Sequence, residues 1–146
     1  DFCAENLGIP HPVLAKPDGS HLAEIETITE GGFCDVIIDA TGHAGSMVQC
    51  HQYAAVGGRV VYVGITAQDL TFPQAPFFHR RELSVMASRN ALPEDFPEII
   101  QIITDGKINL QNWITHRLDI TEVPEEFDKF TAPATGALKA VITVND

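Results

Sequence analysis

Apolar residues recur at helical spacing in four stretches of the chain. In the first, Leu22, Ile25 and Ile28 repeat every three residues, Ser20 can cap the start, and two glycines at positions 31 and 32 end the helix. The same period, bounded by proline or glycine, predicts the other helices. These helices are expected at Ser46–Val56, from Pro93 to Gly106, and from Val123 to Phe130.

Other apolar runs are short and rich in β-branched residues, which is typical of strands. Cys34–Asp39 and Arg59–Gly64 are apolar on both faces, as parallel strands covered on both sides are. Because a helix separates them, they are expected to pair in parallel. Leu83–Ser88 follows a charged stretch and suits a sheet edge. His11–Ala15 and Lys139–Val144 complete the predicted strands.

This alternation of strands and helices predicts an α/β protein with a parallel sheet. Such sheets bind ligands beyond the carboxyl ends of their strands, here at Asp39–Gly42 and Val63–Ile65, where the residues are small. The glycine-rich phosphate-binding motifs GxGxxG and GxxxxGK[ST] do not occur in the chain. The residues by themselves therefore indicate a ligand-binding α/β domain.

Charge and cysteine content narrow the class of protein. Nine basic and twenty acidic residues give a formal net charge of -11, which disfavours nucleic acid and anionic membranes as partners. A phosphate-bearing cofactor remains possible, because one locally positive pocket suffices for it. No apolar run approaches the ~18 residues of a membrane helix. The three cysteines are widely spaced, which argues against a disulfide framework and favours a reducing, cytoplasmic location.

The beginning of the chain is unusual. Asp1 is not a methionine, and Phe2–Gly8 has the pattern of the last turns of a helix that ends at glycine. Neither a signal peptide nor a transit peptide is recognisable. We therefore expect a fragment of a larger protein; the alternative is a mature protein with a frayed N-terminal helix.

Five segments, in this order, resemble the medium-chain, zinc-type alcohol and polyol dehydrogenases: Cys34–Gly42, Ala55–Gly64, Ser88–Ala91, Ile114–Arg117 and Thr135–Ile142. The resemblance implies a Rossmann-like parallel sheet without its first two strands. It implies that residues 1–90 are the later part of the dinucleotide-binding domain and that residues 91–146 are a C-terminal segment joining the catalytic domain. The stretch from Ser88 to Pro93 is most similar to members that oxidise polyols or sugar acids, such as L-galactonate or sorbitol-type dehydrogenases.

The resemblance also implies an activity. The parent enzyme would transfer hydride between NAD or NADP and a secondary alcohol of a polyol or sugar acid, using zinc held outside this segment. The segment alone is expected to be inactive. Two alternatives stay open: a zinc-independent quinone- or enoyl-reductase-like relative, and a non-catalytic nucleotide-binding or interaction module. In the family, equivalent edge strands of two subunits pair, so a homo-oligomer through residues 83–88 is expected.

Cofactor-binding residues follow from the same resemblance. Thr41 and Gly42 would lie against the adenosine half of the cofactor. Gly64 and Ile65 would approach the nicotinamide, which a bulky side chain at Gly64 would block. The remaining expected contacts are Arg89 and Asn90 beside the nicotinamide and substrate, and Lys139 on the pyrophosphate. Each assignment has a simpler alternative. Thr41 and Gly42 could form a capping turn, and Gly64 could be required only by the backbone. Arg89 and Asn90 could belong to a surface loop, and Lys139 could be an exposed lysine at the start of a strand.

Other polar residues are expected to be structural. Asp39 ends a strand, but the acid that reads the ribose belongs to a preceding strand in the family. Cys50 and His51 are adjacent on a predicted helix and point about 100° apart, which makes a shared metal ion awkward. Together with the isolated His43, they lead us to predict no metal site in this chain. His116 is expected to have a hydrogen-bonded structural role.

Overall fold

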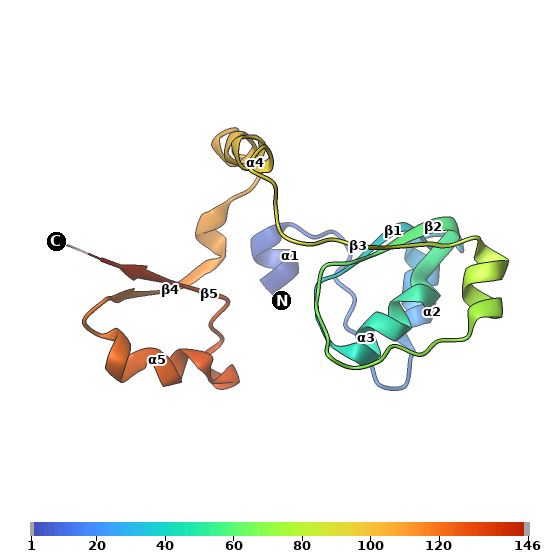
Figure 1. The fold of residues 1–146 in the computed structure, drawn as a ribbon, viewed down its shortest axis with the longest axis horizontal. Helices are drawn as coiled ribbons and strands as arrows, with labels where there is room; N and C mark the ends of the chain where they lie inside the picture. The colour runs from blue at the N-terminus through green and yellow to red at the C-terminus, as the bar shows by residue number, and fades with distance from the viewer. Residues whose placement is uncertain (1, 145–146) are drawn as a thin grey trace. The chain divides into compact units, whose positions relative to one another are not determined.

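The computed structural model describes residues 2–144, and the chain divides into two compact units (Figure 1). Ile9–Asn90 forms the first unit. The second combines the segment up to Gly8 with the segment from Ala91 onward. The break after Asn90 falls where the sequence suggests a domain boundary, although α1 (Phe2–Leu7) belongs to the second unit. Which unit serves cofactor binding and which serves the catalytic domain remains a prediction.

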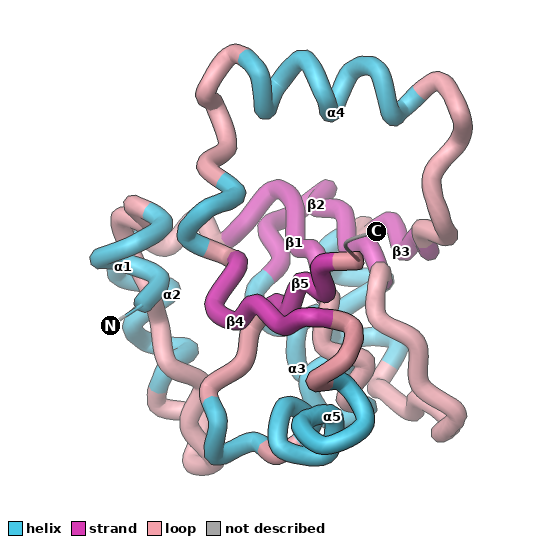
Figure 2. The backbone as a smooth tube through the Cα atoms, turned by 90° about the vertical axis from the view of Figure 1, so that its left-hand side faces the viewer, coloured by secondary structure: helices cyan, strands magenta, loops and turns pink. Residues whose placement is uncertain are grey.

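Three parallel strands form the sheet of the first unit, in the order β1 (Cys34–Asp39), β2 (Ala54–Tyr62), β3 (Ser84–Ala87) (Figure 2). The predicted α/β class and the parallel pairing are therefore confirmed. β3 lies at one edge, as expected, and all of its residues are exposed. The expected strand at His11–Ala15 is wrong: this segment joins no ladder with any described strand, so β1 is the other edge.

The helices of the first unit pack on one face of this sheet. α3 (Ala44–Gln49) and the 3₁₀ turn at Cys50–Tyr53 cover that face directly, and α2 (His21–Ile28) joins them through a 2.6 Å hydrogen bond between His21 Nε2 and the Tyr53 hydroxyl. The core beneath them is small and consists of Met47, Cys50, Ala54 and Val60, all buried. The opposite face carries Val36, Ile38 and Met86, which are 49%, 65% and 52% exposed. The expectation that both faces are covered is therefore wrong within the described residues.

The predicted helix Ser46–Val56 is also wrong in extent. α3 ends at Gln49, and Ala54 already belongs to β2. Arg81 holds the chain in the turn that follows α3, because its Nη1 donates to Gln52 O at 2.9 Å and to Ala54 O at 2.7 Å. These carbonyls gain a partner without a further helical turn. Residues 55–58, expected to end the helix, instead form an irregularity within β2.

The start and end of α2 also depart from the pattern. Ser20 precedes the helix, but its side chain makes no capping hydrogen bond. Its backbone N–H instead donates to Asp18 Oδ1 at 3.0 Å, so the aspartate organises the turn. At the other end, Thr29 Oγ1 donates to Ile25 O at 2.8 Å, and the helix stops before the two glycines.

The second unit contains a two-stranded parallel sheet and three helices. β4 (Ile114–Asp119) pairs with β5 (Lys139–Thr143), and α5 (Val123–Thr131) lies along them (Figure 1). Between helix and strands is an apolar cavity of about 190 Å³. Its lining residues are Leu118, Val123, Phe127, Phe130, Ala140 and Ile142.

The other two helices of this unit are α1 and α4 (Asp95–Thr104), the latter ending near Gly106 as predicted. α1 is joined to the unit by the rings of Phe2 and Trp113, whose centroids are 6.4 Å apart. β4 is the element that the hydrophobic pattern did not predict as a strand. Among the residues that the structure describes, no helix is long and apolar enough to cross a membrane.

Candidate functional site

The three strands of the first unit end in register. Asp39 of β1 pairs with Tyr62 of β2, and Tyr62 pairs with Ala87 of β3. Because the strands are parallel, the segments that follow them leave the sheet at the same edge, which is where α/β sheets bind ligands. Six of the seven predicted cofactor residues lie in these three segments: Thr41, Gly42, Gly64, Ile65, Arg89 and Asn90.

A groove of about 870 Å³ opens at the ends of β2 and β3. Gly64, Ile65, Arg89 and Asn90 line it, so the structure brings these four predicted residues together. The Ile65 side chain is 89% exposed, which leaves it free to contact a ligand. Val63, which the sequence places at a ligand-binding strand end, also lines the groove, together with residues that were not assigned to the site: Met47, Tyr62, Thr66, Gln68, Leu70, Ala87 and Ser88. Thr66 and Ser88 directly follow or precede a predicted residue along the chain, whereas Met47, Gln68 and Leu70 come from further away.

Asn90 ends the β3 side of the groove in a left-handed backbone conformation, with φ of 56°. Asparagine tolerates this conformation better than most residues do. Asparagine is enriched in this conformation in proteins generally, so an asparagine just after a predicted strand could have indicated a sharp turn.

Thr41 and Gly42 do not line this groove, but they pack against Gly64 and Ile65, which do. A Cβ atom on Gly64 would lie 2.2 Å from Gly42 N and 3.1 Å from Thr41 N. A Cβ atom on Gly42, whose φ is +63°, would lie 2.7 Å from Ile65 O. Both glycines are therefore required by the packing of one loop on the other. This requirement is independent of the predicted contact between Gly64 and the nicotinamide ring.

Asp39 is the polar centre of this edge. Its Oδ1 accepts hydrogen bonds from Thr41 N at 3.0 Å and from Thr41 Oγ1 at 2.8 Å, and its Oδ2 accepts from Ser46 Oγ at 2.7 Å. Burial favours the neutral acid, but the hydrogen bonds from Ser46 and Thr41 outweigh it and lower the pKa of Asp39. The carboxylate is therefore ionised and fully occupied by its own chain.

A buried cluster forms the floor beneath the groove. The Tyr62 hydroxyl lies 2.8 Å from Met47 O and 2.9 Å from His51 Nε2, and its one proton is donated to one of these two acceptors at a time. His51 is fully buried and its Nδ1 donates to Val48 O at 3.1 Å. Burial, followed by the charge of Asp39, raises the pKa of the Cys50 thiol to about 11. An uncharged thiol that already donates to Met47 O is a poor nucleophile near neutral pH.

No metal centre is formed by the described part of the chain. Within residues 2–144, no group of three or more histidine, cysteine, aspartate or glutamate side chains could hold a metal ion. His43 is used differently: its Nδ1 accepts from Ser46 N at 3.2 Å and caps α3. His116 contacts Thr115 Oγ1 at 3.0 Å and packs edge-on against Phe130.

Lys139 is the one predicted site residue of the second unit. It is exposed, begins β5 and pairs with Ile114 of β4. Its backbone carbonyl accepts a long 3.4 Å hydrogen bond from Thr115 Oγ1. Its assignment to the cofactor pyrophosphate remains a prediction.

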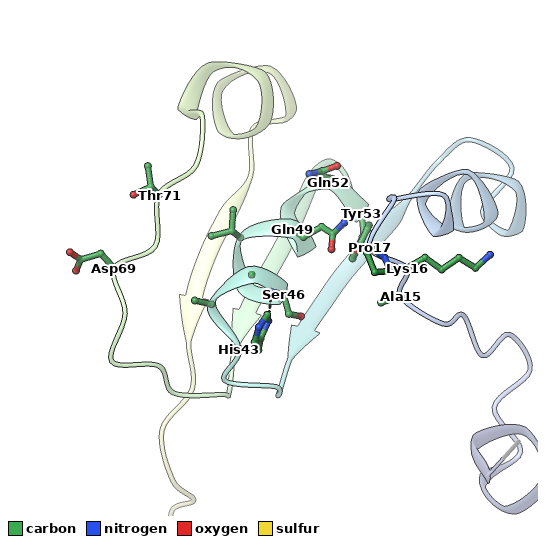
Figure 3. A pocket seen from close by; sticks show the side chains of 13 residues that line it. Ala15, Lys16, Pro17, His43, Ser46, Gln49, Gln52, Tyr53, Asp69 and Thr71 are labelled. Atoms are coloured by element: carbon green, nitrogen blue, oxygen red, sulfur yellow. Dashed lines mark hydrogen bonds between the residues drawn. The ribbon is translucent and has the colours of Figure 1, made fainter. Parts of the chain in front are cut away.

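A second groove, of about 830 Å³, lies along α3 in the first unit (Figure 3). His43 and Ser46 face each other at its lower end, whereas the side chain of Lys16 extends away from them (Figure 3). Its other lining residues are mixed: Gln49, Gln52, Tyr53, Asp69 and Thr71 are polar, whereas Ala15, Pro17, Ala44 and Val48 are apolar. Because none of the predicted cofactor residues lines this second groove, the groove at the strand ends is the candidate site.

Comparison with known proteins identifies the family of the chain. Residues 2–105 match the family model described as zinc-binding dehydrogenase. The chain belongs to this family. Among its relatives, L-galactonate-5-dehydrogenase from Escherichia coli K12 is 33% identical over 132 residues, covering 90% of this chain and 38% of that protein. The chain thus spans little more than a third of the length of this curated relative.

Solved structures of alcohol dehydrogenases share the fold. Zinc dependent alcohol dehydrogenase 2 from Streptococcus pneumonia superposes with a TM-score of 0.85 at 22% identity, over 98% of this chain and 41% of that one. An alcohol dehydrogenase from Escherichia coli CFT073, solved with its cofactor NADH, gives a TM-score of 0.73 at 26% identity, over 88% of this chain and 36% of that one. The Rossmann-like fold expected from the resemblance is therefore confirmed.

Proposed function

We propose that this chain forms part of the NAD(P) site of a dehydrogenase that acts on a secondary alcohol of a polyol or sugar acid. The observation that carries the proposal is the groove at the ends of β2 and β3, where four residues assigned to the nicotinamide side lie together. The family match and the NADH-bound relative support the cofactor, and the L-galactonate-5-dehydrogenase relative supports the substrate class.

The groove fits a flat ring with polar substituents. Gly64 presents backbone without a side chain, Ile65 offers an exposed apolar surface, and Arg89 and Asn90 supply hydrogen-bond donors. The loop at Thr41-Gly42 would face the adenosine half, and Lys139 would neutralise the pyrophosphate. When bound, the nicotinamide cofactor accepts or donates the hydride, while these residues bind and orient it.

The described residues do not fit a zinc ion, so no step is assigned to zinc here. We place the zinc of the complete enzyme on residues outside this chain. It follows that the 146-residue chain should bind cofactor without oxidising any alcohol. Zinc-dependent turnover of L-galactonate by the purified chain would contradict this part of the proposal.

The binding step can be tested by titrating the ¹⁵N-labelled chain with NADH. We expect the amide resonances of Gly64, Ile65, Arg89 and Asn90 to shift together. Ile65→Asp should weaken binding at least fivefold, because it places a negative charge beside a negatively charged cofactor. Val56→Asp is the matched control, since Val56 is also highly exposed, at 73%, but lies outside the groove. Equal affinities of the two variants, or no shift at the groove in the unmodified chain, would overturn the proposal.

A further inference from the structure

We propose that Asp39 is a positioning residue of the cofactor site, which holds the loop after β1 and the turn after β2 in one arrangement without touching the cofactor. The inference rests on the proposed function, because it assigns a role within that site. The sequence predicts only a structural role for this carboxylate at the end of a strand. The inference goes further, since it connects Asp39 to both the loop after β1 and the turn after β2.

The side chain of Asp39 fixes the first loop. It accepts three hydrogen bonds, two from Thr41 and one from Ser46, all between 2.7 and 3.0 Å. Thr41 Oγ1 in turn accepts from His43 N at 3.1 Å. The carboxylate thereby connects the end of β1 to the first turn of α3 through the two hydroxyl groups of this segment, those of Thr41 and Ser46.

The backbone of the same residue fixes the second loop. The Asp39 carbonyl accepts from Val63 N at 2.8 Å and from Gly64 N at 3.0 Å. These two amides begin the segment that lines the groove, so the turn after β2 is attached to the residue that organises the turn after β1.

Direct packing couples the two loops. Gly64 lies so close to Gly42 that no Cβ atom fits between them, and Gly42 packs against Ile65 O. A displacement of Thr41-Gly42 must therefore move Gly64 and Ile65, because close-packed backbone cannot absorb it locally. Losing the carboxylate should alter the groove although Asp39 does not line it.

Asp39 is poorly placed to bind a ligand itself. The residue is only 5% exposed, and both carboxylate oxygens already accept hydrogen bonds from the protein. Its effect on binding must pass through the residues that it holds.

The test combines NADH titration and amide hydrogen exchange on the ¹⁵N-labelled 146-residue chain. Asp39→Ala should raise the dissociation constant for NADH at least tenfold and should speed exchange of the Val63 and Gly64 amides, although their acceptor, the Asp39 carbonyl, is retained. Asp39→Asn should recover most of the affinity. Its amide oxygen can still accept from Thr41, and its NH₂ group can donate to the Ser46 hydroxyl oxygen.

Asp119 provides a matched control. At the end of β4, Asp119 Oδ1 accepts from Thr121 N at 2.9 Å and from Thr121 Oγ1 at 2.7 Å, which repeats the Asp39–Thr41 geometry in the other unit. Asp119→Ala should disturb the amide of Thr121 and leave the NADH dissociation constant within twofold. A loss of affinity equal to that of Asp39→Ala would mean that general destabilisation, not positioning, is being measured.

The pattern of amide exchange shows whether Asp39 holds one loop or both. If Asp39→Ala speeds exchange at Thr41 and Ser46 but leaves Val63 and Gly64 unchanged, the residue holds only its own loop and the inference is wrong. If the unmodified chain shows no NADH shift, the proposed function fails, and the exchange data alone decide whether Asp39 couples the loops. If Asp39→Ala does not fold, Ser46→Ala removes only the Oδ2 hydrogen bond and should raise the dissociation constant about threefold; an unchanged value would overturn the inference.

Discussion

Cys50 illustrates how burial tunes a single residue. Its side chain lies within the small core and is 3% exposed, and burial raises its pKa from the ordinary 9.0 to about 11. The folded state therefore holds the thiol proton more tightly than the unfolded state does. The stabilisation is complete below about pH 9 and is lost as the pH rises through 11.

We expect the free energy of unfolding to fall by about 2–3 kcal/mol between pH 9 and pH 11, since each pKa unit corresponds to about 1.4 kcal/mol. Cys50→Ser should flatten most of this slope, because serine keeps a donor to Met47 O but does not titrate. A slope should remain above pH 10, since burial also raises the pKa of Tyr62, and by more than it raises the pKa of Cys50. Urea unfolding at several pH values measures this. Cys3→Ser, at an exposed cysteine, should leave the slope unchanged.

Gly64 is predicted to be essential for packing between the two loops. Gly64→Ala places a Cβ atom 2.2 Å from Gly42 N and should destabilise the chain by about 2–3 kcal/mol, the range for an overpacked contact. Gly57→Ala is the control: its Cβ would meet nothing within 4 Å, so only the φ of +75° costs stability, about 1 kcal/mol. Thermal and urea unfolding compare the two variants. Equal losses would show that the loops separate easily.

At the scale of elements, β3 is an exposed edge with a defined orientation. Ser88 N donates to Tyr62 O at 2.8 Å, so the alternating N–H groups of Met86 and Ser84 face β2. The N–H groups of Val85 and Ala87 consequently face away from the sheet. A second copy of the chain could pair with these groups, which is the arrangement that the family resemblance implies.

We therefore expect the chain to self-associate through β3. Val85→Pro should weaken association at least tenfold with little loss of stability, because the donor it removes points outward. Met86→Pro is the contrasting variant, since it removes a donor to β2 and should destabilise the unit itself. Sedimentation over a range of concentrations measures the association. A chain that stays monomeric throughout would contradict the prediction.

At the scale of the whole molecule, net charge bears on cofactor binding. The chain carries -11, and a dinucleotide adds further negative charge, so a local cation is needed where the phosphates bind. Lys139 is the residue that we assign to this role. Its effect should be electrostatic and therefore sensitive to salt.

Lys139→Ala should raise the dissociation constant for NADH about tenfold at low salt, since a charge-assisted hydrogen bond contributes about 1.5–3 kcal/mol. The difference should shrink as salt is added, and Lys139→Arg should keep most of the affinity. Lys107→Ala is the control, because Lys107 is also exposed but lies 3.6 Å from Asp105. If Lys139→Ala binds NADH as tightly as the unmodified chain at low salt, Lys139 is an ordinary exposed lysine.

Local sequence patterns determined the elements that depend on nearby residues. The helix that ends at Gly106, the helix that opens with Pro124, and the strand Cys34–Asp39 were all predicted, because helical spacing, a proline in the first turn and a β-branched run act within a few residues. The edge position of β3 followed from the charges that precede it. The predicted cofactor residues next to Gly64 and Asn90 came from the family resemblance and from their place at strand ends.

Only the tertiary structure decided what depends on distant partners. The turn between α3 and β2 is held by Arg81, which lies some thirty residues further along the chain than the carbonyls it binds. His11–Ala15 has a strand-like pattern but no ladder, since pairing needs a neighbour that the pattern cannot supply. The pair Gly42 and Gly64, and the role of Asp39 between their loops, come from an approach of two strand ends more than twenty residues apart. The sequence shows which residues are small or charged. Which of them lie close together depends on the pairing of the strands, because parallel pairing brings the ends of separate strands to one edge of the sheet.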